Sequence, residues 1–259
     1  MSARVSVTGC SVYVPDLGAP GPEKAKQVLG RKGLLYKEPA TRLALCAVHR
    51  ALGGEDGVWV EPGEVDPHTA VVAASNLGSV SSIVDTVRTA RAEGWRSVSP
   101  LAAPNASANV IASTVAIWYR FGGPNLLFCS GALAGMDAIA AGGLLIRSGR
   151  ARRVVVVGAE PEDPVAREVH AGRSGKPRQL RQGAGCLLLE PAGAPGALAD
   201  LGLVRSVEGL SEPDEFYGAD SVIRVAMAVS EPDADRVEIV GGDDADGRRS
   251  ITVFRAGGR

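Results

Sequence analysis

The 259-residue sequence has few of the side chains that build metal sites, disulfide frameworks or nucleic-acid interfaces. It contains three histidines and four cysteines, and aromatic residues make up 4% of the chain. The cysteines form no CxxC pair and no Cys/His spacing, so we expect neither a zinc site nor a disulfide framework. The formal net charge is −1. Without a basic stripe, nucleic acid is not expected as the main partner, because phosphate binding needs clustered Lys and Arg.

We expect neither an export signal nor a membrane anchor in this sequence. Residues 1–9 hold no apolar stretch of the kind found in signal peptides. The longest nearly apolar run, residues 126–146, contains Ser130, Asp137 and four glycines, which does not fit a membrane span. We expect a protein of the reduced cytoplasm that holds no cofactor and no metal.

Apolar residues recur in patterns that predict alternating helices and strands. Helices are predicted over residues 41–52, 80–93, 107–119 and 135–148, and strands over 5–8, 69–74, 126–129, 152–158 and 185–190. After a linker at 191–197, the tail is predicted to form strand 201–207, helix 221–229 and strands 237–240 and 251–254. Residues 161–182 are expected to be irregular. Four consecutive valines at 154–157 predict a strand buried on both faces, so the fold class is α/β with a sheet between helix layers.

Two glycines, Gly142 and Gly143, interrupt the predicted helix 135–148. Each costs about 1 kcal/mol in a helix interior, so their presence predicts that another backbone comes very close there. We therefore expect this helix to be central in the fold.

Two short motifs resemble ligand-binding loops but lack essential residues. Residues 172–176 end like a phosphate-binding loop, yet His170 replaces the first glycine and Pro177 follows the lysine where Ser or Thr is required. The acidic run 243–247 lacks the first ligand and the terminal Glu of a calcium loop. A solvated loop and a tight turn are the preferred interpretations.

Residues 104–160 carry a series of motifs in a specific order. They are Asn105 with Asn109, Phe-Gly-Gly-Pro-Asn at 121–125, Gly-Met-Asp-Ala-Ile at 135–139, Leu-Ile-Arg-Ser-Gly at 145–149 and Val-Val-Val-Val-Gly-Ala-Glu at 154–160, with further matches at 4–9 and 182–190. This series resembles the amino-terminal half of β-ketoacyl synthases and of their chain-length-factor partners. The resemblance implies a thiolase-like fold with a mixed sheet. It covers roughly residues 4–190, so residues 191–259 are expected to be a reduced β-α-β-β second half packed on the first.

In the condensing members of that family, the strand after the Gly-Pro turn leads to a nucleophilic cysteine at a sharp turn before a helix. Backbone N–H groups there stabilise a thiolate and then a thioester oxyanion. The spacing of the motifs puts this position at Ala132, which cannot carry an acyl group. Cys129 lies three residues earlier and is either a small buried side chain of the strand or a displaced nucleophile.

The two histidines of the family lie in its second half, within His-Gly-Thr and Gly-His motifs. Neither motif occurs in this sequence. Residues 240–244 are expected either where the first motif would fall or in a terminal hairpin, and no histidine is present in either case.

The resemblance also implies a dimer. In the family, the strand before the nucleophile pairs antiparallel with its counterpart across the dimer axis, and here that strand comprises Asn125, Leu126, Leu127, Phe128 and Cys129. A bulky residue of segment 99–104 commonly reaches into the partner's acyl tunnel, and the residues at that place are Leu101 and Ala102. The alternative for both is ordinary interface or core packing.

These features support a non-catalytic, chain-length-factor-like subunit that forms a heterodimer with a catalytic ketosynthase and shapes its acyl tunnel. The pathway would be of the type II polyketide or fatty-acid type, including polyene systems. The alternative is a divergent acyltransferase or thioesterase of the same fold that uses Cys129. A third hypothesis is a homodimer that binds acyl chains or an acyl carrier protein. The basic residues Arg147, Arg150, Arg152 and Arg153 either contact such an acidic carrier or are simply solvated.

Overall fold

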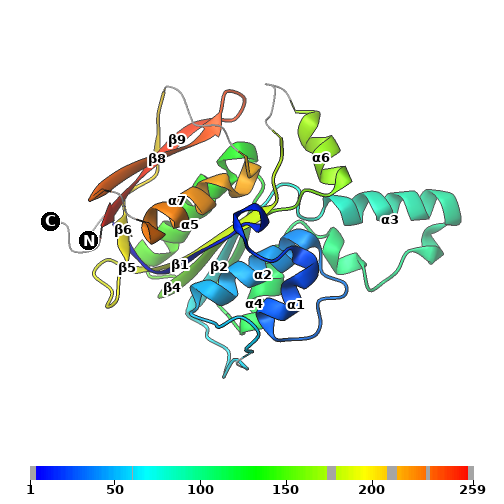
Figure 1. Cartoon of the computed structure of the whole chain (residues 1–259), viewed down its shortest axis with the longest axis horizontal. Coiled ribbons are helices and arrows are strands. Elements are labelled where there is room, and N and C mark those ends of the chain that lie inside the picture. The colour runs from blue at the N-terminus through cyan, green and yellow to red at the C-terminus, as the bar shows by residue number, and fades with distance from the viewer. Residues whose placement is uncertain (1–3, 60, 174–178, 209–214, 232–233, 256–259) are drawn as a thin grey trace.

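One curled mixed sheet organises the chain (Figure 1). The computed structural model describes residues 4–59, 61–173, 179–208, 215–231 and 234–255. Within these residues the strands are β1 (Val5–Tyr13), β2 (Thr69–Ala74), β3 (Asn125–Phe128), β4 (Arg153–Glu160), β5 (Gly183–Pro191), β6 (Ala199–Leu201), β7 (Arg205–Ser206), β8 (Arg236–Asp243) and β9 (Gly247–Arg255). Their order is β3-β2-β4-β5-β1-β6-β9-β7, and β8 pairs with β9. Strand β2 runs parallel to β3 and β4, whereas the remaining pairs are antiparallel.

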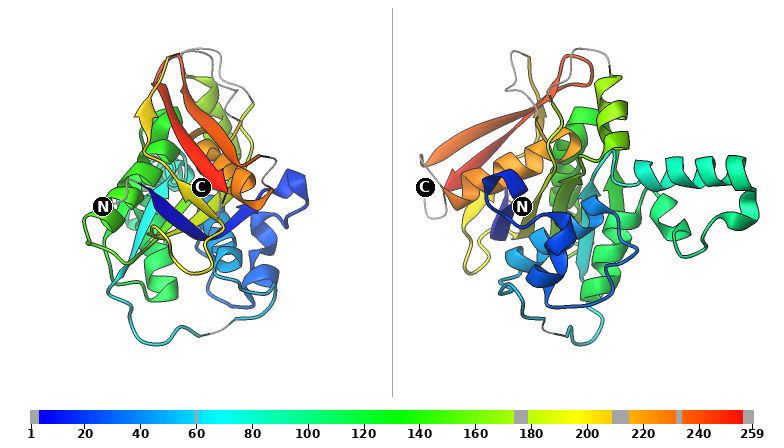
Figure 2. Two further views of the ribbon diagram at one scale, coloured as in Figure 1. Left: turned by 90° about the vertical axis from the view of Figure 1, so that its left-hand side faces the viewer. Right: turned by 45° about the vertical axis from the view of Figure 1, so that its right-hand side comes forward.

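Helices cover both faces of this sheet (Figures 1 and 2). The helices are α1 (Ala25–Leu29), α2 (Pro39–Ala51), α3 (Val80–Glu93), α4 (Val110–Tyr119), α5 (Ala134–Arg147), α6 (Pro164–Ala171) and α7 (Asp220–Ser230). Helices α1, α2 and α4 pack on one face, and α5 and α7 on the other, where the β8–β9 hairpin curls over α7. None of the helices in the described ranges has the length and apolar character needed to cross a membrane.

The valines of β4 explain the layered arrangement. Val154 and Val156 point into the core shared with α5 and α7, whereas Val155 and Val157 point into the core shared with α2 and α4. Side chains alternate between the two faces of a strand, so an uninterrupted apolar run needs a helix layer on each side. This confirms the predicted α/β class, and the pairing of the strands confirms the predicted mixed sheet.

Most of the predicted elements are present, and two predictions are wrong. Strand 201–207 is broken into β6 and β7. Helix α6 lies inside the segment expected to be irregular, where the Asp163 side chain caps it by accepting hydrogen bonds from the N–H groups of Val165 and Ala166, and Pro164 occupies its first turn. Only eight residues long, α6 is too short for a clear periodic pattern. Residues 174–177 of the incomplete phosphate-loop motif lie outside the described residues.

Residues 80–107 form an arm that projects from the body (Figures 1 and 2). Helix α3 makes up its outgoing half, and only Ser82 of that helix is buried. The root of the arm is tied to the body through hydrogen bonds from Ser82 to Glu38 and from Asn105 to the Tyr36 carbonyl. The arm therefore has little apolar support within its own chain.

Gly142 and Gly143 do not mark a close approach of another backbone, so that expectation is wrong. A Cβ added at Gly142 would lie 2.8 Å from Val156 Cγ2 and 3.1 Å from Leu189 Cδ1. The close neighbours are thus side chains of the sheet, onto which α5 packs tightly. A Cβ at Gly143 would meet only the end of the flexible Arg147 side chain.

These two glycines allow a matched test of the packing of α5. We predict that Gly142→Val lowers the free energy of unfolding by about 1–3 kcal/mol, because the added atoms overpack the core. Gly143→Ala should raise it by up to about 1 kcal/mol, because alanine is the better helix former. Urea unfolding followed by circular dichroism measures both. Equal losses in the two variants would contradict this account of the helix.

Candidate functional site

The sharp turn between β3 and α5 contains the position expected for the family nucleophile. Gly131–Leu133 form a 3-10 turn that leads directly into α5, and Gly131 has a φ of 64°. Ala132 is 1% exposed and packs in a small apolar cluster with Leu77 and Tyr217. The turn thus offers an alanine methyl group, which has no nucleophilic chemistry.

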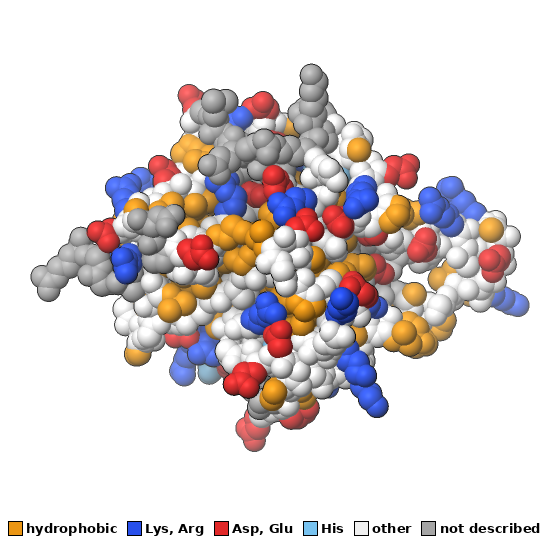
Figure 3. All heavy atoms as spheres, in the orientation of Figure 1, with side chains coloured by type: hydrophobic (Ala, Val, Ile, Leu, Met, Phe, Trp, Pro, Cys, Tyr) orange, Lys and Arg blue, Asp and Glu red, His pale blue; other side chains and the backbone are white. Residues whose placement is uncertain are grey.

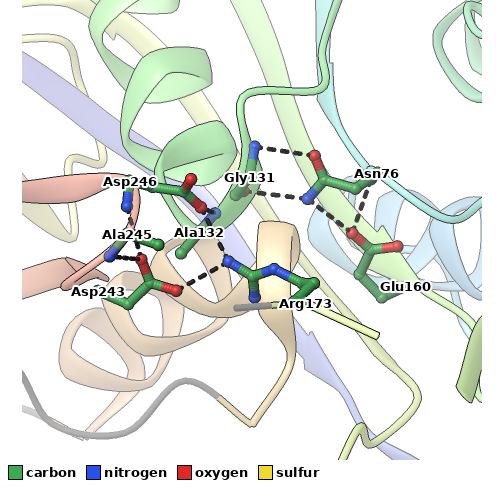
Figure 4. Close-up of polar contacts among 8 residues, drawn as sticks. All are labelled: Asn76, Gly131, Ala132, Glu160, Arg173, Asp243, Ala245 and Asp246. Carbon is green, nitrogen blue, oxygen red and sulfur yellow. Dashed lines mark hydrogen bonds and ion pairs between the residues drawn. The ribbon is translucent and has the colours of Figure 1, made fainter. Parts of the chain in front are cut away.

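A buried carboxylate supports this turn through the side chain of Asn76 (Figure 4). Glu160, at the end of β4, is fully buried and accepts hydrogen bonds from the N–H groups of Asn76 at 2.7 Å and Leu77 at 3.0 Å, and from Ser75 Oγ at 3.2 Å. The Asn76 side chain in turn contacts the Gly131 backbone twice. Its Oδ1 accepts the Gly131 N–H, and its Nδ2 donates to the Gly131 carbonyl, both at 3.0 Å. Glu160 therefore fixes the backbone that follows β2. Asn76 lies in this backbone segment, and its side chain holds the turn at Gly131.

Burial raises the pKa of Glu160 to about 7, although the backbone and side-chain hydrogen bonds partly oppose the shift. A carboxylate without solvent favours its neutral form unless donors compensate. Four donor contacts from Ser75, Asn76 and Leu77 supply part of that compensation.

A second carboxylate contacts the same turn on the side opposite Asn76 (Figure 4). Asp246, in the turn of the β8–β9 hairpin, accepts the Ala132 N–H at 2.8 Å. Arg173 Nη2 donates to Asp246 Oδ2 at 2.9 Å and to Asp243 Oδ2 at 2.8 Å. Residues 240–244 thus belong to the terminal hairpin, and the hairpin turn meets the site.

Cys129 is exposed, so its expected place as a small buried side chain inside the strand is wrong. It follows Phe128, the last residue of β3, which lies at the edge of the sheet. Partial desolvation raises the pKa of the Cys129 thiol, and the negative charge of Glu160 raises it further. The thiolate, which is the reactive form, is accordingly disfavoured.

The residues expected at a dimer interface are accessible. Among the strands of the described ranges, β3 pairs with β2 alone. Its Leu126 is 39% exposed, whereas Asn125, Leu127 and Phe128 are half-buried. Leu101 lies on the arm and is 59% exposed. Half-buried Ala102 lines a cavity of about 490 Å³ between the arm and residues 35–42. Ala132 does not line that cavity.

Four residues of this site were not predicted as site residues from the sequence: Asn76, Glu160, Arg173 and Asp246. One of them carried a usable signal. Glu160 ends an otherwise apolar, doubly buried strand, and a carboxylate at such a place requires hydrogen-bond donors nearby. Asp243 and Asp246 were recognised only as parts of a tight turn.

The sheet order, the two helix layers and the turn before α5 define a thiolase-like ketosynthase fold. The family model for the β-ketoacyl synthase N-terminal domain matches residues 29–172, which is more than half of the chain. The chain therefore belongs to the β-ketoacyl synthase family.

Similar proteins agree with this assignment. The 3-oxoacyl-[acyl-carrier-protein] synthase 2 of Rhizobium meliloti (strain 1021) is 30% identical over 164 residues, which cover 63% of this chain but only 38% of that protein. The solved ishigamide ketosynthase/chain length factor superposes with a TM-score of 0.75 at 21% identity, covering 97% of this chain and 99% of that one. The ketosynthase ApeO in complex with its chain length factor ApeC, from Xenorhabdus doucetiae, gives a TM-score of 0.66 at 16% identity, covering 96% and 98%.

The raised pKa of Glu160 predicts a specific dependence of stability on pH. The folded-state pKa of about 7 exceeds the ordinary value of 4.5. The contribution of this group is therefore fully present below pH 4.5 and is lost as the pH rises through 7. The free energy of unfolding should fall over this window by up to about 3 kcal/mol.

Glu160→Gln should flatten this slope, whatever its effect on absolute stability. Glu162→Gln, which alters a partly exposed carboxylate two residues away, should keep it. Urea unfolding at a series of pH values measures the slopes. If wild type and Glu160→Gln show the same slope, the assignment to Glu160 fails.

Proposed function

We propose that this chain is a non-catalytic partner of a ketosynthase. The pathway is of the type II polyketide or fatty-acid type, and a polyene pathway is one such case. The observation that carries the proposal is the turn before α5. Its key residue is a buried alanine, and the N–H of that alanine is already occupied by Asp246 of the same chain. This turn has no nucleophile to bind an acyl group, and its backbone N–H donor is not free to stabilise an oxyanion. The turn is therefore better suited to a partner subunit than to a condensing one.

The arm supports association with another protein. Along it, Ile83 is 41% exposed, Val87 42%, Trp95 75% and Leu101 59%, and the space-filling view shows apolar side chains on this projection (Figure 3). Exposed apolar groups gathered on one projecting element are typical of an interaction surface. In this proposal the partner covers the arm, and Leu101 contributes to the wall of the partner's acyl tunnel beside Ala102.

The free edge of β3 provides a second contact for the partner. Pro124 and Phe128 direct their carbonyls toward β2, where they accept the N–H groups of Val71 at 2.9 Å and Ser75 at 3.1 Å. Because backbone groups alternate along a strand, Asn125 and Leu127 direct theirs outward. An edge of this kind can accept a strand from another chain. The ketosynthase and chain length factor complexes with the same fold support a heterodimer. The alternative, a homodimer, would use the same edge.

The proposal also divides the chain into two unequal parts. Residues 1–190 form the ketosynthase-like half and residues 191–259 a reduced second half, which is supported by β6 and β9 extending the sheet beyond β1.

An acyl carrier protein is a further partner, for which exposed Arg150 and Arg152 are candidate contacts. Arg153 is paired with Glu190 at 2.8 Å and is less suited to that role.

The exposed Cys129 thiol favours one alternative, a divergent acyltransferase or thioesterase. Its position one residue beyond β3 makes it accessible to a thioester. Its raised pKa and the neighbouring charge of Glu160 oppose formation of the thiolate, so this function ranks second.

Leu127 provides a direct test of edge pairing. We predict that Leu127→Pro abolishes or weakens at least about tenfold the 1:1 complex with the ketosynthase encoded nearest to this chain, because proline removes an outward N–H and fills the edge. Leu127→Ala loses the same side-chain packing but keeps the N–H, and should still form the complex. Light scattering after size-exclusion chromatography gives the masses.

The proposal fails in either of two cases. In the first, the wild-type chain and the ketosynthase elute separately. In the second, Leu127→Pro and Leu127→Ala bind the ketosynthase equally well while both remain folded, which would place the interface elsewhere.

A further inference from the structure

The carboxylate of Asp246 accepts hydrogen bonds from two donors that lie outside its own hairpin. Its Oδ2 accepts the Ala132 N–H at 2.8 Å and an N–H of Arg173 at 2.9 Å. The three residues lie in the hairpin turn, in the turn before α5 and two positions after the end of α6. Sequence separation between Ala132 and Asp246 is 114 residues, so this contact is a feature of the tertiary fold.

The surroundings leave room for a carboxylate at this place. Gly131 has no side chain, and a Cβ built there would collide with the Asp246 carboxylate. The positive φ of Gly131 also suits glycine. The turn thus exposes a backbone donor beside a gap that the carboxylate fills.

Arg173 is held in position independently of Asp246. Its guanidinium lies 3.9 Å from the centre of the Tyr217 ring and donates to Asp243 at 2.8 Å. Its side chain is only 16% exposed. Asp243 is itself ordered, because its Oδ1 accepts the N–H groups of Ala245 at 3.0 Å and Asp246 at 2.8 Å. Removal of the Asp246 carboxylate would therefore leave both donors in place.

We infer that the Ala132 N–H and the Arg173 guanidinium form a carboxylate-binding site whose resident ligand is the chain's own Asp246. The hairpin carries this ligand and closes the turn against outside carboxylates and acyl groups. A small carboxylate takes the site when Asp246 is removed, since one charged donor and one backbone N–H at the same point favour an anion. This inference concerns the isolated chain and holds whether or not the chain binds a ketosynthase.

Chemical rescue with formate tests the inference. We expect Asp246→Ala to unfold at a lower temperature than wild type. Sodium formate should restore part of that loss in a saturable way, relative to sodium chloride at equal ionic strength. Wild type should show no such specific gain. Asp244→Ala is the matched control, because Asp244 lies in the same hairpin turn but its side chain is 87% exposed and pairs with Arg248.

A specific, saturable gain in Asp246→Ala alone supports the site. An equal shift in all three proteins, or no shift in Asp246→Ala, overturns it, since formate would then act as a general ion or not bind at all.

A second variant covers the case in which Asp246→Ala fails to fold. Asp246→Asn keeps the shape of the side chain and removes its charge. In nuclear magnetic resonance spectra of alanine-labelled protein, the Ala132 amide proton should move upfield in this variant, with other alanine amides far from the turn unchanged. An unchanged Ala132 resonance would show that Asp246 does not occupy the N–H in solution and would overturn the inference.

Discussion

The buried carboxylate of Glu160 joins parts of the molecule that are far apart in the sequence. It lies at the end of β4, accepts the N–H groups that follow β2 and, through Asn76, orders the turn at Gly131. A charge-bearing group at zero exposure needs several donors, and these donors come from one place, the end of β2. The geometry of the turn, the start of α5 and the docking of the hairpin therefore all depend on this interaction.

Two regions of the molecule have opposite characters. At the turn, the Asn76 side chain, which Glu160 orders, binds the Gly131 backbone, and Asp246 accepts the Ala132 N–H, so these polar groups are satisfied within the chain. Among the described residues, apolar side chains of the arm are exposed, and the outer edge of β3 pairs with no other strand. This distribution supports the proposed role as a partner subunit.

Sequence reasoning predicted the layers well because burial on both faces leaves a direct mark, as in the valines of β4 and the coincident bounds of β2 and α3. Motif spacing also identified Ala132 as the residue at the turn. The exposure of Cys129 was missed, because exposure depends on β3 lying at the sheet edge, which local composition does not encode. The Asp246 contact with Ala132 joins residues 114 positions apart, and no periodicity in either segment predicts such a pair.

The central claim is that this chain takes part in acyl chemistry without carrying the acyl group. The most direct test is the intact mass of the purified chain after exposure to acyl thioesters of an acyl carrier protein, followed by peptide mapping of the cysteines. The account predicts an unchanged mass, with the Cys129 thiol free. A stable adduct on Cys129 that is passed on to a second acceptor would contradict it and would establish the chain as an acyltransferase.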